Sequence, residues 1–209
     1  MTKNWHIFAQ NVMSLTDARY FAAFEAEYLC FSCNPEEAAF IAPNIILAIA
    51  GWTEGAKLAG SFGTAESDEK IRSLAAALNL QAVVLQATHN FSSLTDLPLI
   101  LDVKISANDA FSAEGETKHR HFLAQQPTLS GFILDFENQQ VDYSILNLYA
   151  AAAPTWAKNV GIDETTFSNY TRFAPDLRGF VLEGSVEEAV GVKDFEYLEA
   201  AIEIITQER

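Results

Sequence analysis

The chain has 209 residues, a length that fits one large domain or at most two small ones. Its 13 basic and 28 acidic side chains give a net charge of −15, which disfavours binding to nucleic acid or to an anionic membrane surface. No apolar run approaches the ~18 residues of a membrane-spanning helix, and the first residues lack the apolar core of a signal peptide. We therefore expect a soluble, cytoplasmic protein that binds neither nucleic acid nor membranes.

Eight short apolar runs alternate with helical patterns along the chain. This alternation predicts parallel strands joined by crossover helices. The expected strands are residues 7–13, 28–33, 57–62, 80–86, 99–105, 131–135, 156–161 and 179–182.

Several of the connecting segments carry helix signals. Thr16 and Asp17 open a first helix that extends through Phe24, and Ser67 and Asp194 are predicted N-caps of two later helices. The segment after the fourth strand carries only a weak helical turn around residues 92–94. Apolar stripes with helical spacing are Ile71, Leu74, Ala75 and Leu78; Ile145, Leu148, Tyr149 and Ala152; and Leu198, Ala201, Ile202 and Ile205.

Eight such units in about 200 residues predict an α/β fold that closes as a (β/α)₈ TIM barrel, a single compact domain over residues 1–209 with short loops. An open, doubly wound sheet is the alternative. No glycine-rich dinucleotide turn follows the first strand and no P-loop occurs. We therefore expect no nucleotide cofactor, and no other cofactor is indicated.

The two cysteines of the chain, Cys30 and Cys33, lie in the second predicted strand, on opposite faces. A zinc site would need a second pair of ligands, and the four histidines show no suitable spacing. We expect two buried or strand-end thiols in a reducing compartment, and no metal site.

Chemistry in a barrel belongs at the carboxyl ends of the strands. Asp135 ends the apolar run that starts at Gly131, and a carboxyl among apolar neighbours is suited to act as a general acid. Alternatively, Asp135 caps the next helix or pairs with Lys104. Five acidic residues at predicted strand ends also allow a cation site, although solvated carboxylates are the simpler interpretation. They are Asp102, Asp135, Glu137, Asp163 and Glu183.

Several turn segments are similar to those of one family. Residues 11–16, Asn-Val-Met-Ser-Leu-Thr, resemble Lys-Ile-Cys-Gly-Leu-Thr of phosphoribosylanthranilate isomerase, a (β/α)₈ barrel of tryptophan biosynthesis. Residues 31–43 resemble its Phe-x-Phe-x-x-x-Ser-Pro-Arg-Tyr-Val-Ser-Pro segment. Residues 183–187 and 191–194 resemble its Ser-Ser-Gly-Val-Glu and Gly-Val-Lys-Asp pair. Segments 60–63 and 82–86 extend the similarity over almost the whole chain.

The resemblance implies an Amadori rearrangement of N-(5′-phosphoribosyl)anthranilate, in which an acid protonates the ring oxygen and a base removes a proton from C2. It implies Asp135 as the acid. Met13 falls on the catalytic base, and a thioether cannot exchange a proton near neutral pH. Cys33, one strand away, is the candidate substitute base. Ala39 replaces an arginine that faces the substrate in the family.

The turns that bind phosphate in the family have also changed. Gly161 keeps one glycine of the turn after the seventh strand, and residues 136–140 replace a glycine-rich loop. Glu183, Gly184 and Ser185 replace the Ser-Ser-Gly turn, so that a carboxylate stands where the resemblance places phosphate.

Three hypotheses follow. The first is an isomerase-like barrel that is impaired or inactive, a pseudoenzyme with a binding or structural role. The second is an active sugar or sugar phosphate isomerase that uses Asp135 and a substitute base. The third is a metal-assisted enzyme at the acidic strand ends. A ligand would be a sugar or sugar phosphate, and the protein a monomer or homodimer.

Overall fold

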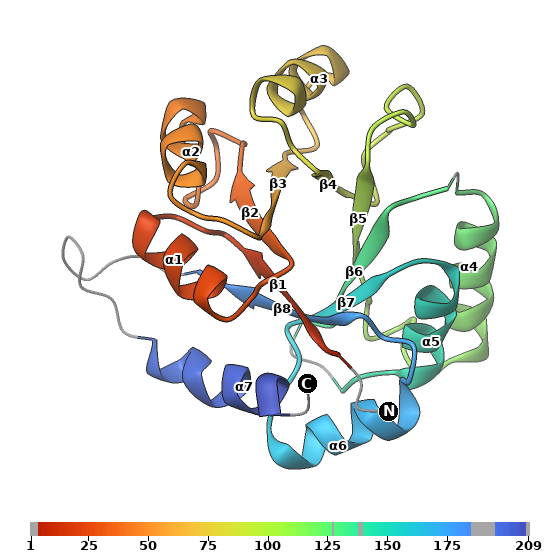
Figure 1. Ribbon diagram of the computed structural model, residues 1–209. Helices are drawn as coiled ribbons and strands as arrows, with labels where there is room; N and C mark the ends of the chain where they lie inside the picture. The colour runs from red at the N-terminus through yellow and green to blue at the C-terminus, as the bar shows by residue number, and fades with distance from the viewer. Residues whose placement is uncertain (1–3, 127, 138–139, 185–194, 208–209) are drawn as a thin grey trace.

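The computed structural model describes residues 4–126, 128–137, 140–184 and 195–207. In these residues, eight parallel strands close into a barrel in sequence order, with seven helices around them (Figure 1). The predicted TIM barrel is thus confirmed, and the open sheet is wrong. The strands are β1 His6–Gln10, β2 Tyr28–Ser32, β3 Lys57–Phe62, β4 Ala82–Gln86, β5 Leu99–Lys104, β6 Gly131–Asp135, β7 Thr155–Lys158 and β8 Gly179–Glu183. The helices are α1 Leu15–Ala23, α2 Pro43–Ala50, α3 Asp68–Ala77, α4 Ala113–Ala124, α5 Tyr143–Ala152, α6 Glu164–Phe173 and α7 Glu196–Gln207.

All eight predicted strands exist, but two of them end three residues early. β1 stops at Gln10 instead of Met13, and β7 stops at Lys158 instead of Gly161. Asn11 and Asn159, which follow directly, have φ angles of 53° and 54°. This left-handed conformation ends an extended strand, and asparagine tolerates it better than most residues.

Helix boundaries follow the local signals closely. Ser67 caps α3 as predicted, accepting a hydrogen bond from the backbone N–H of Lys70. α1 begins one residue before the predicted Thr16, because Ser14 is its N-cap. The cap assigned to Asp194 lies outside the described residues. Residues 87–98, between β4 and β5, contain turns but no helix, and none of the described helices is both long and apolar enough to cross a membrane.

Strand alternation divides the core into two layers. The inner layer fills the barrel and includes Phe8, Tyr28 and Trp156, whose ring centroids lie 5.1–5.7 Å apart. The outer layer lies between the strands and the helices. Cys30 belongs to the inner layer and Cys33 to the outer one, and both thiols are buried and free, as predicted.

The barrel closes where β8 pairs with β1. Gly179 lies opposite His6 in this pair, and a Cβ at Gly179 would overlap the backbone of His6, so the close approach requires glycine. At the same end of the barrel, the Glu27 carboxylate accepts hydrogen bonds of 3.0 and 3.1 Å from Arg178 and one of 3.2 Å from Lys57. One carboxylate therefore joins segments from three parts of the chain.

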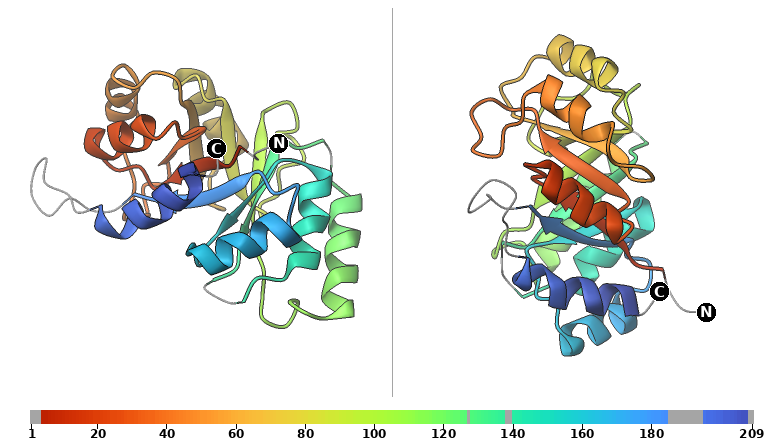
Figure 2. Two further views of the ribbon diagram at one scale, coloured as in Figure 1. Left: turned by 60° about the horizontal axis from the view of Figure 1, so that its bottom comes forward. Right: turned by 60° about the vertical axis from the view of Figure 1, so that its left-hand side comes forward.

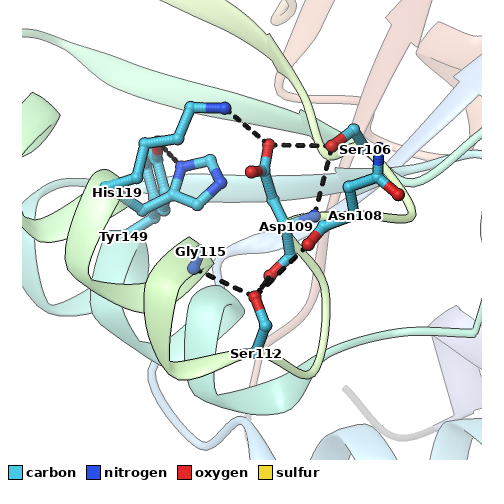
Figure 3. A network of polar contacts seen from close by, with 8 residues as sticks. Ser106, Asn108, Asp109, Ser112, Gly115, His119 and Tyr149 are labelled. Atoms are coloured by element: carbon cyan, nitrogen blue, oxygen red, sulfur yellow. Dashed lines mark hydrogen bonds and ion pairs between the residues drawn. The ribbon is translucent and has the colours of Figure 1, made fainter.

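A second polar network joins α4 to α5 and to the turn before α4 (Figure 3). The His119 ring nitrogen Nδ1 lies 2.8 Å from the Tyr149 hydroxyl, and both side chains are buried. Asp109 pairs with Lys118 at 2.7 Å, and Ser112 caps α4. This network lies outside the barrel and holds two neighbouring helices together.

Candidate active site

Polar side chains from five strands converge at the carboxyl end of the barrel. Gln10 is paired with Glu183 in the sheet, and Asp135 with Lys158. Asp102 of β5 completes the group, since it interacts electrostatically with Asp135 and Lys158. We call these five residues the mouth cluster.

Asp135 is the last residue of β6, and its side chain is buried. Its Oδ1 accepts hydrogen bonds from the backbone N–H of Glu137 at 2.9 Å and from Nδ2 of Asn159 at 2.8 Å. The structural roles considered for Asp135 belong to other residues. Asp142 caps α5, and Lys104 pairs with Glu137 at 2.9 Å. The carboxyl is thus oriented by the turns that follow β6 and β7.

Lys158 is the cation of the mouth cluster. Only 13% of its side chain is exposed, and its Nζ lies 3.0 Å from Oε1 of Glu183. Burial lowers the pKa of Lys158, but the carboxylates of Asp102 and Glu183 outweigh burial and raise it. Lys158 is therefore a fixed positive charge and not an amine nucleophile.

Asp102 is the carboxyl of the mouth cluster with increased proton affinity. Burial raises the pKa of Asp102, and the nearby Lys158 only partly opposes this. The amide of Gln10 lies near Asp102 across the barrel and favours the charged form of its carboxyl, which lowers the pKa. Among the described residues, the buried Oε1 of Gln10 has no hydrogen-bond partner.

The resemblance places Met13 at the catalytic base and Ala39 at an arginine that faces the substrate, and both lie in turns beyond the strand ends. Met13 is half-buried in the turn after β1, three residues beyond Gln10, and its backbone N–H donates to Asp17 at 2.9 Å. Ala39 is half-buried in the turn before Phe40. The side chain that ends β1 in the mouth cluster is Gln10.

Cys33 follows β2 in the outer layer, 2% exposed. Its Sγ lies 3.9 Å from the carbonyl oxygen of Phe31. Burial raises the pKa of Cys33 to about 12. The structure therefore does not bring Cys33 together with Asp135, because alternation turns its side chain toward the helices.

The turn residues assigned to ligand binding have separate environments. Gly161 is exposed between β7 and α6. Gly184 donates its N–H to the Gln10 carbonyl at 2.8 Å, and a Cβ there would overlap the carbonyl oxygen of Asn11. Ser185 lies outside the described residues. Glu183, 41% exposed at its side chain, also accepts a 3.2 Å hydrogen bond from Asn11.

The five acidic residues at the predicted strand ends do not form a metal site. In the part of the chain that the structure describes, no group of three or more His, Cys, Asp or Glu side chains is arranged to hold a metal ion. Asp163 caps α6 through two backbone N–H groups at 2.9 Å. Glu137 pairs with Lys104.

Sequence reasoning missed the roles of Gln10 and Lys158. Both carried a signal, since each lies two residues after an aromatic residue of the inner layer, Phe8 and Trp156 respectively. A period of two places all four on the inward face. Because these two strands were expected to end at Met13 and Gly161, Gln10 and Lys158 were not identified as their last inward-facing residues.

No family model matches the sequence, and the search of curated proteins found no match. Solved structures with this fold include the phosphoribosylanthranilate isomerase of Thermotoga maritima, which is 17% identical with a TM-score of 0.74, over 97% of this chain and 99% of that one. The isomerase of Thermus thermophilus is 19% identical with a TM-score of 0.72, over 98% and 100%. A 3-hexulose-6-phosphate synthase is 11% identical with a TM-score of 0.60, over 99% of each chain. The likeness agrees with the resemblance seen in the sequence and establishes the fold.

Proposed function

We propose that this protein is a phosphoribosylanthranilate isomerase-like barrel that no longer catalyses the isomerisation. One observation carries the proposal. The cluster at the carboxyl ends of the strands includes a carboxyl at the position of the acid, Asp135, but the residue that ends β1 is Gln10, an amide. Fold alone does not decide activity, because one barrel supports many reactions.

The catalytic base is missing whichever of two residues is assigned to its position. By sequence resemblance the position falls on Met13, and by strand geometry it falls on Gln10. Neither a thioether nor a carboxamide accepts a proton at neutral pH. Loss of a general base typically costs a factor of 10² to 10⁴ in rate.

The electrostatics of the mouth also disfavour a phosphate group. Glu183 and Glu137 occupy the two turns where the resemblance expects phosphate to bind. The nearest lysines are already paired, Lys158 with Glu183 and Lys104 with Glu137. A phosphate dianion would have to compete with carboxylates that belong to the protein.

A steady-state assay with freshly made phosphoribosylanthranilate tests the proposal. We expect turnover at least about 10³-fold below an ordinary enzyme's ~10 s⁻¹, and no difference between the wild type and Asp135→Asn. Family-like turnover that is lost in Asp135→Asn would overturn the proposal.

A repair experiment separates the two assignments of the base. We expect Gln10→Cys with Glu183→Ser to produce measurable turnover, because it combines a thiol at the end of β1 with a less negative turn. The matched control, Met13→Cys with Glu183→Ser, should stay at background. Turnover in the control alone would assign the base position to Met13.

Asp102 supports a second candidate function, an active sugar phosphate isomerase in which Asp102 replaces the base. Its pKa is raised by burial, and it lies near Asp135, so the two carboxyls could divide the roles of base and acid. In that case wild-type turnover would fall by 10²-fold or more in Asp102→Asn. Cys33→Ser, which changes a buried thiol of the outer layer, would leave turnover unchanged.

A further inference from the structure

The mouth cluster carries more negative than positive charge. Asp102, Asp135 and Glu183 face a single ammonium group, that of Lys158, which leaves a formal charge of −2. Lys158 lies 3.0 Å from Glu183. The neighbouring Glu137 is paired with a lysine of its own and adds no net charge. Buried charges without compensation are costly, so the cluster favours the approach of a cation.

The mouth cluster also has hydrogen-bond acceptors that receive no donor. Gln10 is only 6% exposed, and its buried Oε1 has no partner among the described residues. The two hydrogen bonds to the Asp135 carboxyl both reach Oδ1, so its Oδ2 accepts none from the part of the chain that the structure describes. The Asp102 carboxyl lies near both residues. A buried acceptor without a donor is unfavourable, and a ligand that donates hydrogen bonds relieves this cost.

The mouth cluster is open to a small molecule from the end of the barrel. The helices lie around the outside of the strands (Figure 2), so the cluster lies within the ring that they form. Asp102 and Glu183 are half-buried, whereas Gln10 and Asp135 are buried. A ligand therefore meets the half-buried carboxyls first and places a small group against the buried ones.

The two deficits together select one chemical group. A primary ammonium group supplies a positive charge and three N–H donors, and it has no acceptor of its own. A hydroxyl supplies one donor and no charge, and a phosphate adds negative charge and further acceptors. The net charge of −15 also concentrates cations around the chain. The ammonium group is thus the one that meets both deficits of this mouth.

We propose that the mouth cluster binds a small organic amine, whose primary ammonium group is held by Asp102, Asp135 and Gln10. The ligand carries neither phosphate nor carboxylate, and Lys158 stays paired with Glu183. This inference rests on the proposed function, because a sugar phosphate and an amine need opposite charge at the same mouth.

Isothermal titration calorimetry with three four-carbon probes tests the ligand class. The probes are 1,4-diaminobutane, 1,4-butanediol and succinate, which have the same chain length and are cationic, neutral and anionic at pH 7. We expect 1,4-diaminobutane to bind the wild type with a Kd of about 0.1–1 mM. The other two probes should give no heat of binding at about 10 mM.

Charge-matched variants test whether the amine binds at the mouth. Asp102→Asn and Asp135→Asn should each weaken the binding of 1,4-diaminobutane about tenfold or more, because each removes a charged acceptor. Glu114→Gln removes the same charge from an exposed position of α4 and should change the Kd less than about twofold. Circular dichroism confirms that each variant is folded.

A variant that gains affinity keeps the test independent of damage to the fold. Gln10→Glu adds a carboxylate beside Asp102 and should tighten the binding of 1,4-diaminobutane about tenfold. Unchanged or weaker binding in a folded Gln10→Glu would show that Gln10 does not face the ligand.

Four results would overturn the inference. They are no binding of 1,4-diaminobutane, equal weakening in Glu114→Gln and Asp102→Asn, binding of 1,4-butanediol as tight as that of the diamine, and binding of succinate. The isomerase assay keeps this inference distinct from the proposed function. Absence of both amine binding and turnover overturns only the amine site, whereas family-like turnover overturns the proposed function whatever the calorimetry shows.

Discussion

At the residue scale, Lys158 determines the charge of the mouth cluster. It is the buried cation among Asp102, Asp135 and Glu183, and it contacts Glu183 at 3.0 Å. Removal of one partner from a buried group of charges leaves the remaining charges uncompensated. Lys158 is therefore a structural requirement of this mouth, whatever reaction the mouth supports.

Lys158→Met should lower the free energy of unfolding by about 2–3 kcal/mol at pH 7, because three carboxylates lose their counter-charge. Lys104→Met is the control, since its pair with Glu137 is largely exposed, at 66% and 45% of the two side chains. It should cost less than about 0.5 kcal/mol. Urea unfolding measures both variants, and equal losses would contradict this account. The deficit of Lys158→Met should shrink at lower pH, as the carboxyls become protonated.

At the element scale, the His119–Tyr149 contact between α4 and α5 couples helix packing to pH (Figure 3). Burial lowers the pKa of His119, and the nearby charge of Lys118 lowers it further. The carboxylates of Asp109 and Asp142 oppose this shift but do not reverse it. The neutral ring is thus the form that fits between the helices. The buried Nε2 of His119 has no partner among the described residues.

Because the pKa of His119 is lowered in the folded chain, the protein loses stability at acidic pH. In the unfolded chain His119 binds a proton near pH 6.5, and in the folded chain only at lower pH. Stability is therefore complete above about pH 6.5 and is lost as the pH falls toward the folded pKa. Between pH 7.5 and 5, the wild type should lose more stability than His119→Gln, which does not titrate. His121→Gln, on the exposed side of α4, should follow the wild type in urea unfolding at each pH.

At the scale of the whole molecule, closure of the barrel depends on the approach of β8 to β1. Gly179→Ala should lower the free energy of unfolding by about 3 kcal/mol or more, because its Cβ would overlap the His6 backbone. Gly161→Ala is the matched control, since the nearest atom to its Cβ would be Cγ2 of Thr166 at 3.9 Å. Thermal unfolding compares them, and a stable Gly179→Ala would show that β8 can shift away from β1.

The whole barrel also explains which parts of the site could be predicted. The eight apolar runs and the cap at Ser67 are local signals, and the sequence alone contained them. The placement of Asp135 at the end of β6 was equally local. The end of β1 was not, because the left-handed turn at Asn11 stops the strand and Asn11 bonds to Glu183, 172 residues away.

The sequence by itself therefore determined the number and order of the strands, the class of fold and the acidic character of the chain. Only the tertiary structure decided that Lys158 neutralises Glu183, that Gln10 lies near Asp102, and that Cys33 lies in the outer layer. The physical reason is that periodicity specifies which face of a strand a residue occupies, once the strand's ends are known. Which side chains of distant strands come together is decided by how the barrel closes, and no local pattern encodes that closure.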